Sequence, residues 1–187
     1  MALSRMERVH QAMAQHDLDV LLLSVGADLP WLTGYEAMPL ERLTMLVVPR
    51  DGQATLVVPG LEAPRVVDRP DQFALRPWSE TEDPVGIVAD LVGPARQGAI
   101  GDQTWARFVV ELQHAAPTLR LGRAGPVVCP LRAVKEPCEI EMLARADEAV
   151  DRIATRLLNA EIELVGRTEA QVSAEQVQQY QADVNDN

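Results

Sequence analysis

The chain has 187 residues, of which 47% are apolar and 24% charged, and its net charge is −11 at pH 7. This composition is typical of a globular protein that is long enough to bury a core of its own. The negative charge argues against binding to nucleic acid or to an anionic membrane surface, and the apolar run at 20–23 is far too short to cross a bilayer.

The first part of the chain alternates helices with strands. Ser4 and Glu7 form a capping box that predicts a helix over about 5–16. A short apolar strand follows at 20–24. Asp28-Leu29-Pro30 then predicts the cap of a short turn of helix that ends at Gly34.

Two β-prone runs, 43–48 and 54–58, flank the turn dipeptide Asp51-Gly52 and therefore predict a hairpin. The other expected elements are helices at 61–68, at 83–91 and after a cap at Thr104, strands at 73–78 and 97–101, and extended segments at 119–121 and 127–129. Strands that alternate with helices through residue 130 predict an α/β fold, a three-layer sandwich with a mixed sheet.

The pattern changes at Pro137, which suits the first position of a helix. Apolar residues at helical spacing then predict a helix over 137–164 that Gly166 ends, and a further helix begins near Thr168. The apolar stripe consists of Ile140, Leu143, Ala146, Val150, Ile153 and Leu157. Left without a partner, this stripe should self-associate or be disordered. The Gln-rich end after Val172 has no apolar face and should fray.

The distribution of charge along the chain predicts two structural parts, and the cysteine usage predicts a reducing compartment. Residues 1–135 carry 13 Arg and Lys against 16 Asp and Glu, a net charge of −3, whereas residues 136–187 carry 4 against 12, a net charge of −8. Cys129 and Cys138 have no neighbouring histidine, so we expect free thiols. No apolar leader is seen at the N-terminus, and we expect a cytoplasmic protein.

The segment LRAVKEPCEI at 131–140, with Leu143 and Ala146 after it, resembles the domain junction of the M24 metallopeptidases. That family includes Xaa-Pro aminopeptidases, prolidases (Xaa-Pro dipeptidases) and creatinase. Upstream, LDVLL at 18–22, LTGY at 32–35 and the hairpin after Arg42 resemble its N-terminal domain in order and spacing. GRTE at 166–169 resembles the next family landmark.

The resemblance implies an RNase H-like creatinase/prolidase N-terminal domain over 1–131. Residues 132–187 would be a linker and the first helices of an incomplete pita-bread catalytic domain. The reaction of the family uses two divalent metal ions (Mn, Co or Zn) held by carboxylates and a histidine in the core of that second domain. A two-metal site needs such a cluster, and the three histidines, His10, His16 and His114, lie in or at the ends of predicted helices. We therefore expect no catalytic residue, no metal site and no peptidase activity in this chain alone.

A charge pair, Glu41-Arg42, stands directly before the predicted strand at 43–48. Arginine can hold a carboxylate through two parallel hydrogen bonds, and peptide substrates of the family carry a terminal carboxylate. By the resemblance, Arg42 and Leu40 match positions that reach across a homodimer into the active site of the partner, with Glu41 and Tyr35 beside them. The alternatives are a solvated ion pair at a strand end and a tyrosine that packs in the core.

Three functions are compatible with these features. The first is the N-terminal domain of a metal-dependent Xaa-Pro peptidase, which serves dimerisation and the gating of a proline-containing peptide substrate. The second is a standalone, non-catalytic α/β module for binding or assembly. The third is a fragment of a creatinase-like amidinohydrolase, against which Pro39 and Leu40 count because creatinase-like chains carry aromatic residues at these places.

Overall fold

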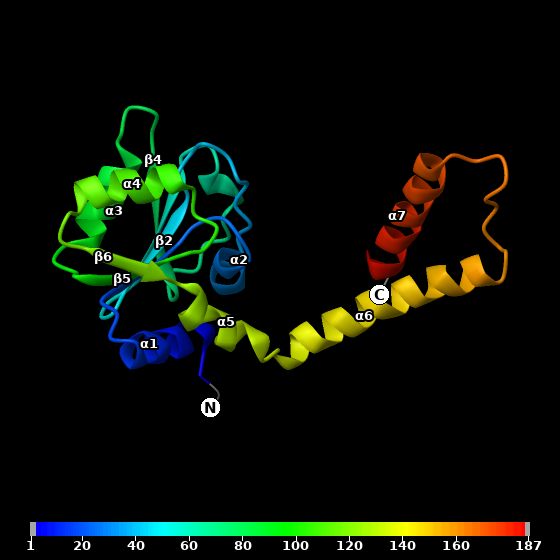
Figure 1. Ribbon diagram of the computed structural model, residues 1–187, viewed down its shortest axis with the longest axis horizontal. Helices are drawn as coiled ribbons and strands as arrows, with labels where there is room; N and C mark the ends of the chain where they lie inside the picture. The colour runs from blue at the N-terminus through cyan, green and yellow to red at the C-terminus, as the bar shows by residue number, and fades with distance from the viewer. Residues whose placement is uncertain (1–2, 186–187) are drawn as a thin grey trace. The chain divides into compact units, whose positions relative to one another are not determined.

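The computed structural model describes residues 3–185, and the chain divides into two compact units after Ala133. The first, called the sheet unit here, contains α1 (Arg5–Gln15), β1 (Val20–Leu23), α2 (Asp28–Thr33), β2 (Met45–Pro49), β3 (Ala54–Pro59), the 3-10 turn η1 (Ala63–Arg65), β4 (Phe73–Trp78), α3 (Pro84–Val92), β5 (Gln97–Ile100), α4 (Ala106–Ala115), β6 (Arg120–Arg123) and α5 (Gly125–Ala133) (Figure 1). The second, called the helical unit, contains α6 (Pro137–Leu158) and α7 (Glu169–Asn185).

Within residues 3–185, six strands form one mixed sheet in the order β4-β3-β2-β1-β5-β6. Strand β1 pairs antiparallel with β2 and parallel with β5, so Leu22 lies opposite Val47 on one side and Ile100 on the other. The predicted hairpin is confirmed, because β2 and β3 pair antiparallel. Gly52 adopts a φ of 107° in their turn, which only glycine adopts without strain.

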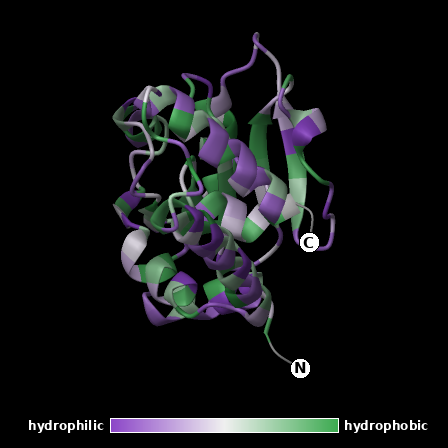
Figure 2. Ribbon diagram, turned by 90° about the vertical axis from the view of Figure 1, so that its right-hand side faces the viewer, coloured by the Kyte–Doolittle hydropathy of each residue, from purple (hydrophilic) through white to green (hydrophobic). Residues whose placement is uncertain are grey.

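Helices cover both faces of this sheet and make the predicted three-layer α/β sandwich (Figure 1). Successive residues of β1 enter opposite cores, as the pleat requires. Leu21 and Leu23 pack in the core that α1 and α5 cover, whereas Val20 and Leu22 pack in the core under α3 and α4. The helices themselves carry hydrophilic and hydrophobic residues side by side, because only one face of each is buried (Figure 2).

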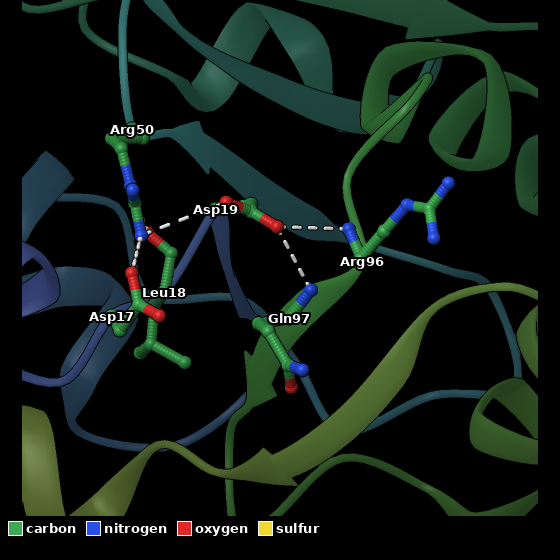
Figure 3. Close-up of polar contacts among 6 residues, drawn as sticks. All are labelled: Asp17, Leu18, Asp19, Arg50, Arg96 and Gln97. Carbon is green, nitrogen blue, oxygen red and sulfur yellow. Dashed lines mark hydrogen bonds and ion pairs between the residues drawn. The ribbon is translucent and has the colours of Figure 1, made fainter.

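Asp19, directly before β1, joins three strands at one end of the sheet (Figure 3). Its Oδ2 accepts hydrogen bonds from the backbone N–H groups of Arg96 and Gln97, both at 2.9 Å, where β5 begins. Its Oδ1 lies 3.6 Å from Nη2 of Arg50, directly after β2, and the same nitrogen lies 2.8 Å from Oδ1 of Asp17. These interactions, led by the bond from Gln97, hold the pKa of Asp19 below its usual value.

Local predictions were confirmed where the chain's own chemistry decides them. The capping box at the start of α1 is present, since the backbone N–H of Glu7 donates to Ser4 Oγ at 3.2 Å and that of Ser4 donates to Glu7 Oε2 at 2.7 Å. Gly34 ends α2 in the left-handed conformation, with a φ of 72°. The prediction that Asp28 caps α2 was wrong, because Asp28 is the first residue of the helix and Ala27 occupies the cap position without a side-chain cap hydrogen bond.

Other local predictions were wrong because packing overrides short-range preference. The segment 127–129, predicted to be extended, lies in α5, where Val127 and Val128 are buried against α1. Only the short turn η1 forms within 61–68. Thr104 does not cap α4, which begins after Trp105 without a side-chain cap.

In the helical unit, α6 begins at Pro137 as predicted but ends at Leu158, short of the expected residue 164. Ala160, which follows the helix, adopts a φ of 57° and leaves the right-handed helical conformation. Gly166 therefore lies in the loop between α6 and α7 and does not end α6.

The Gln-rich end, predicted to fray, instead continues α7 as far as Asn185. It packs along α6, and Arg152 Nε lies 3.1 Å from Asp183 Oδ2. Arg145 Nη2 also donates to the carbonyl of Val184 at 2.8 Å. These polar contacts with α6 hold the end of α7, which lacks an apolar face. The prediction for 186–187 lies outside the described residues.

The apolar stripe of α6 is largely exposed, with exposed fractions of 55% for Ile140, 57% for Leu143 and 53% for Val150. Ala149, by contrast, is buried. Self-association through the stripe stays a prediction.

Candidate functional site

The residues singled out from the sequence gather around one shallow hollow beside the start of β2. The hollow, called the Arg42 hollow here, is lined by Tyr35, Met38, Leu40, Arg42, Thr44, Pro59 and Glu62. Three of the four predicted residues line it. Glu41 does not, and its side chain is 68% exposed.

Buried hydrogen bonds fix the backbone on both sides of this hollow. Ser24 Oγ, at the end of β1, donates to the carbonyl of Thr44 at 2.7 Å. Trp78 Nε1, at the end of β4, donates to the carbonyl of Leu43 at 2.9 Å. Arg42 therefore extends from a segment that is anchored at the ends of β1 and β4, and its guanidinium starts from a defined place.

Tyr35 enters the hollow from the turn that ends α2. Thr33 Oγ1 donates to the carbonyl of Leu29 at 2.8 Å and accepts from the backbone N–H of Tyr35 at 3.1 Å. The Tyr35 hydroxyl donates to Glu62 Oε2 at 2.9 Å, and Arg65 Nη1 lies 2.7 Å from the same oxygen. Burial first, and then the bond to Glu62, raises the pKa of Tyr35 to about 12. The hydroxyl is therefore a proton donor at neutral pH.

Arg42 already holds a carboxylate. Its Nη1 lies 2.9 Å from Glu80 Oε1, whereas its Nε lies 4.0 Å from Glu41 Oε1. The Arg42 side chain is 33% exposed and the Glu80 side chain 66%, so the pair is open to solvent and can exchange partners.

The loop that carries Glu80 has its own support. Glu82 accepts from the backbone N–H of Ser79 at 2.7 Å and from Arg76 Nη2 at 2.5 Å. The bond from Arg76 is the main reason why the pKa of Glu82 is lowered to about 2, followed by the bonds from Ser79. Glu82 therefore stays ionised, and keeps these bonds, at any pH above the acid range.

The sequence could indicate Tyr35, Leu40 and Arg42 because they lie close together along the chain. Glu62, which lines the hollow, and Glu80, which pairs with Arg42, were missed, since each comes from a different loop of the sheet. In the sequence, the one signal for these two carboxylates is that each lies near the end of a strand, and this signal is not specific.

Metal-binding side chains do not gather in the described chain. Among residues 3–185, no group of three or more His, Cys, Asp or Glu side chains could hold a metal ion. The two divalent ions implied by the resemblance thus find no ligand set in this part of the chain. His10 and His114 lie in α1 and α4, and His16 directly follows α1.

Two further observations concern the whole of the described chain. Cys129 and Cys138 are free thiols and both are exposed. No helix within residues 3–185 is both long and apolar enough to span a bilayer.

Known proteins resemble this chain in sequence and in fold. The probable dipeptidase PepE of Mycobacterium tuberculosis is 36% identical over 168 residues, which cover 88% of this chain and 44% of the relative. The crystal structure of dipeptidase PepE from Mycobacterium ulcerans superposes with a TM-score of 0.80 at 34% identity, over 96% of this chain and 48% of that one. A prolidase from Thermococcus sibiricus shares the fold, with a TM-score of 0.79 at 23% identity over 97% of this chain and 50% of that one.

The chain thus spans about half the length of the relatives that it matches. Residues 5–134, most of the chain, match the creatinase/prolidase N-terminal domain family. The match begins with α1, includes the complete sheet and ends directly after α5. The chain therefore belongs to the creatinase/prolidase N-terminal domain family.

Proposed function

We propose that the sheet unit is the N-terminal domain of a metal-dependent Xaa-Pro peptidase and serves dimerisation and substrate gating. The observation that carries this proposal is the Arg42 hollow, in which a partly exposed guanidinium, an apolar side chain and a tyrosine meet on an anchored segment. The catalytic metal centre is not part of this role. Hydrolysis of the peptide bond is assigned to no residue of this chain.

The chemistry of Arg42 suits the terminal carboxylate of a peptide. A guanidinium presents parallel N–H donors that match both oxygens of a carboxylate. Glu80 occupies part of this fork at 2.9 Å and is itself mostly exposed, so a substrate carboxylate could replace it without burying an unpaired charge. Leu40, 42% exposed beside Arg42, offers an apolar contact for the proline ring of such a peptide.

Gating in this proposal takes place across a homodimer. The Arg42 hollow would face the active site of a second subunit, with Arg42 and Leu40 as the contacts and Tyr35 and Glu41 as their neighbours. Tyr35 supports this arrangement because it is held by Glu62 and does not depend on the substrate for its position. The helical unit would be the beginning of the pita-bread domain, which in the parent enzyme would hold two divalent ions.

A domain exchange tests the proposal. Residues 1–133 would replace the corresponding domain of the Mycobacterium tuberculosis PepE protein, and the chimera would be assayed with an Xaa-Pro dipeptide and with its C-terminal amide. We expect Arg42→Ala to raise KM for the free dipeptide about tenfold or more, as the loss of a charge-assisted hydrogen bond implies. The amide lacks the carboxylate, so its KM should not change.

Arg120→Ala is the matched control, because Arg120 is exposed on β6, away from the Arg42 hollow. It should leave both KM values unchanged, and the chimera should sediment as a dimer. Equal KM values for Arg42→Ala and the parent chimera on the free dipeptide would refute the role of Arg42. A fully active monomeric chimera would refute gating in trans.

A further inference from the structure

A second, larger hollow lies in the sheet unit and shares no lining residue with the Arg42 hollow. Its volume is about 730 Å³, within the range of small-molecule sites. It is called the Arg69 hollow here and lies between the first turns of α1, the end of α2, the β2–β3 turn and the turn before β4. Its lining residues are Ser4, Arg5, Met6, Glu7, His10, Trp31, Leu32, Gly52, Gln53, Ala54, Arg69, Asp71 and Gln72.

Side chains in the wall of this hollow hold the surrounding backbone in place. Arg5 Nη1 donates to the carbonyl of Trp31 at 2.7 Å, and its guanidinium carbon lies 5.3 Å from the centre of the Trp31 ring. Gln53 Nε2 donates to the carbonyl of Pro70 at 2.6 Å and so joins the β2–β3 turn to the turn before β4. The hollow is thus preformed between elements that are tied to one another.

Arg69 differs from these residues. Its carbonyl accepts from the backbone N–H groups of Gln72 at 2.8 Å and Phe73 at 3.0 Å, so its backbone is fixed in a tight turn. Its guanidinium lies against Gly34, where an added Cβ would come within 2.9 Å of Nη2. The side chain is half-buried, yet among residues 3–185 its guanidinium makes no hydrogen bond and no ion pair.

An arginine stays charged in a protein, and partial burial of that charge without a partner is unfavourable. An anion would supply such a partner, and the planar fork fits a carboxylate or a phosphate. The charges that line the hollow decide between them. Arg5 and Arg69 are balanced by Glu7 and Asp71, so the wall is neutral overall and would repel a polyanion as much as attract it.

We propose that the Arg69 hollow binds a small zwitterion, a free amino acid or a short peptide, through its carboxylate. Arg69 is the anchor of the carboxylate, and the acidic side chains of the wall, Glu7 and Asp71, face the ammonium group. Trp31 and Leu32 give the hollow an apolar side for the body of the ligand. The site is independent of Arg42 and of the proposed peptidase role.

The test uses the intact chain and follows the indole N–H signals of its three tryptophans by NMR. Trp31 lines the hollow, whereas the Trp78 indole is bonded to the carbonyl of Leu43 and serves as an internal control. The probes are glycyl-proline, its C-terminal amide and inorganic phosphate. We expect glycyl-proline to shift the Trp31 signal saturably, and the amide to bind about tenfold more weakly or worse.

Variants separate this site from others. Arg69→Gln should weaken glycyl-proline binding about tenfold or more, and Arg69→Lys, which keeps the charge but not the fork, should weaken it less. Arg120→Gln, on the exposed β6, should bind as the wild type does. Unchanged signals of the other two tryptophans would show that the variants fold.

Three results would overturn the proposal. The first is a Trp31 signal that glycyl-proline does not move. The second is binding that survives Arg69→Gln, which would place the ligand outside the Arg69 hollow. The third is phosphate that competes at least as well as the dipeptide, which would reduce the site to a simple anion site. None of these results bears on the KM test of Arg42.

Discussion

We expect Tyr35→Phe to destabilise the sheet unit through one hydrogen bond. The Tyr35 side chain is 5% exposed, so phenylalanine fills the same space and only the hydroxyl is lost. A hydrogen bond to a charged acceptor contributes about 1.5–3 kcal/mol to stability. Glu62 keeps its bond from Arg65 at 2.7 Å after the substitution, so we expect the lower end, about 1.5 kcal/mol.

Urea unfolding followed by tryptophan fluorescence measures this loss, because Trp31, Trp78 and Trp105 all lie in the sheet unit. Tyr180→Phe is the matched control. Tyr180 lies on α7, and within residues 3–185 its hydroxyl makes no hydrogen bond. A double-mutant cycle with Glu62→Ala then isolates the pair, since Tyr35→Phe should cost little once the acceptor is gone.

Burial of the Tyr35 hydroxyl, and then its bond to Glu62, predict a loss of stability in alkali. The pKa of Tyr35 is about 12 in the folded protein, against about 10 for a tyrosine in an unfolded chain. The folded state therefore keeps its proton longer, so this contribution is complete below about pH 10 and disappears as the pH rises toward 12. The wild type should lose more stability than Tyr35→Phe over this interval.

A loss below about 0.5 kcal/mol would refute the reasoning, because that is the ordinary effect of a surface substitution. So would a Tyr35→Phe effect of equal size with and without Glu62. Either result would mean that the hydroxyl exchanges Glu62 for water at no cost.

Two further predictions concern the ends of the sheet and the helical unit. Asp19→Asn should lower the urea midpoint near neutral pH, because an amide cannot pair with Arg50 and accepts more weakly from the backbone of β5. Since the pKa of Asp19 is lowered, its contribution to stability is present above about pH 4 and is lost as the pH falls. The urea midpoints of the two proteins should therefore converge in acid. A difference that stays constant with pH would contradict this. Leu143→Glu should abolish the concentration-dependent association of the chain in sedimentation velocity, whereas Glu141→Gln on the same helix should not. A wild type that is monomeric at every concentration would disprove the role of the apolar stripe.

Much of the fold could be predicted because short-range chemistry decides it. The capping box of Ser4 and Glu7, the turn at Gly52 and the helix start at Pro137 each depend on residues within a few positions of one another. The alternation of apolar strands and amphipathic helices likewise indicates a sheet that is covered on both faces. Such features do not depend on distant partners, so reading the chain locally is enough.

Prediction failed where a distant partner decides the outcome. Val127 and Val128 favour an extended backbone, but burial against α1 makes them helical. The Gln-rich α7 has little reason to be a helix alone and forms beside Arg145 and Arg152 of α6. In both cases contact energy exceeds the small differences in intrinsic propensity.

The two hollows likewise separate what the sequence determines from what the tertiary structure decides. By itself the sequence determined the α/β class, the family resemblance and the cluster of Tyr35, Leu40 and Arg42, because these rest on order and spacing along the chain. Only the tertiary structure decided that Glu80 holds Arg42 and that Arg69 lies half-buried against Gly34, with no hydrogen-bond or ion-pair partner for its guanidinium within residues 3–185. The reason is physical: the charge state of an arginine is known from its chemistry, but the dielectric around it and the partners within reach are set by segments far apart in the chain.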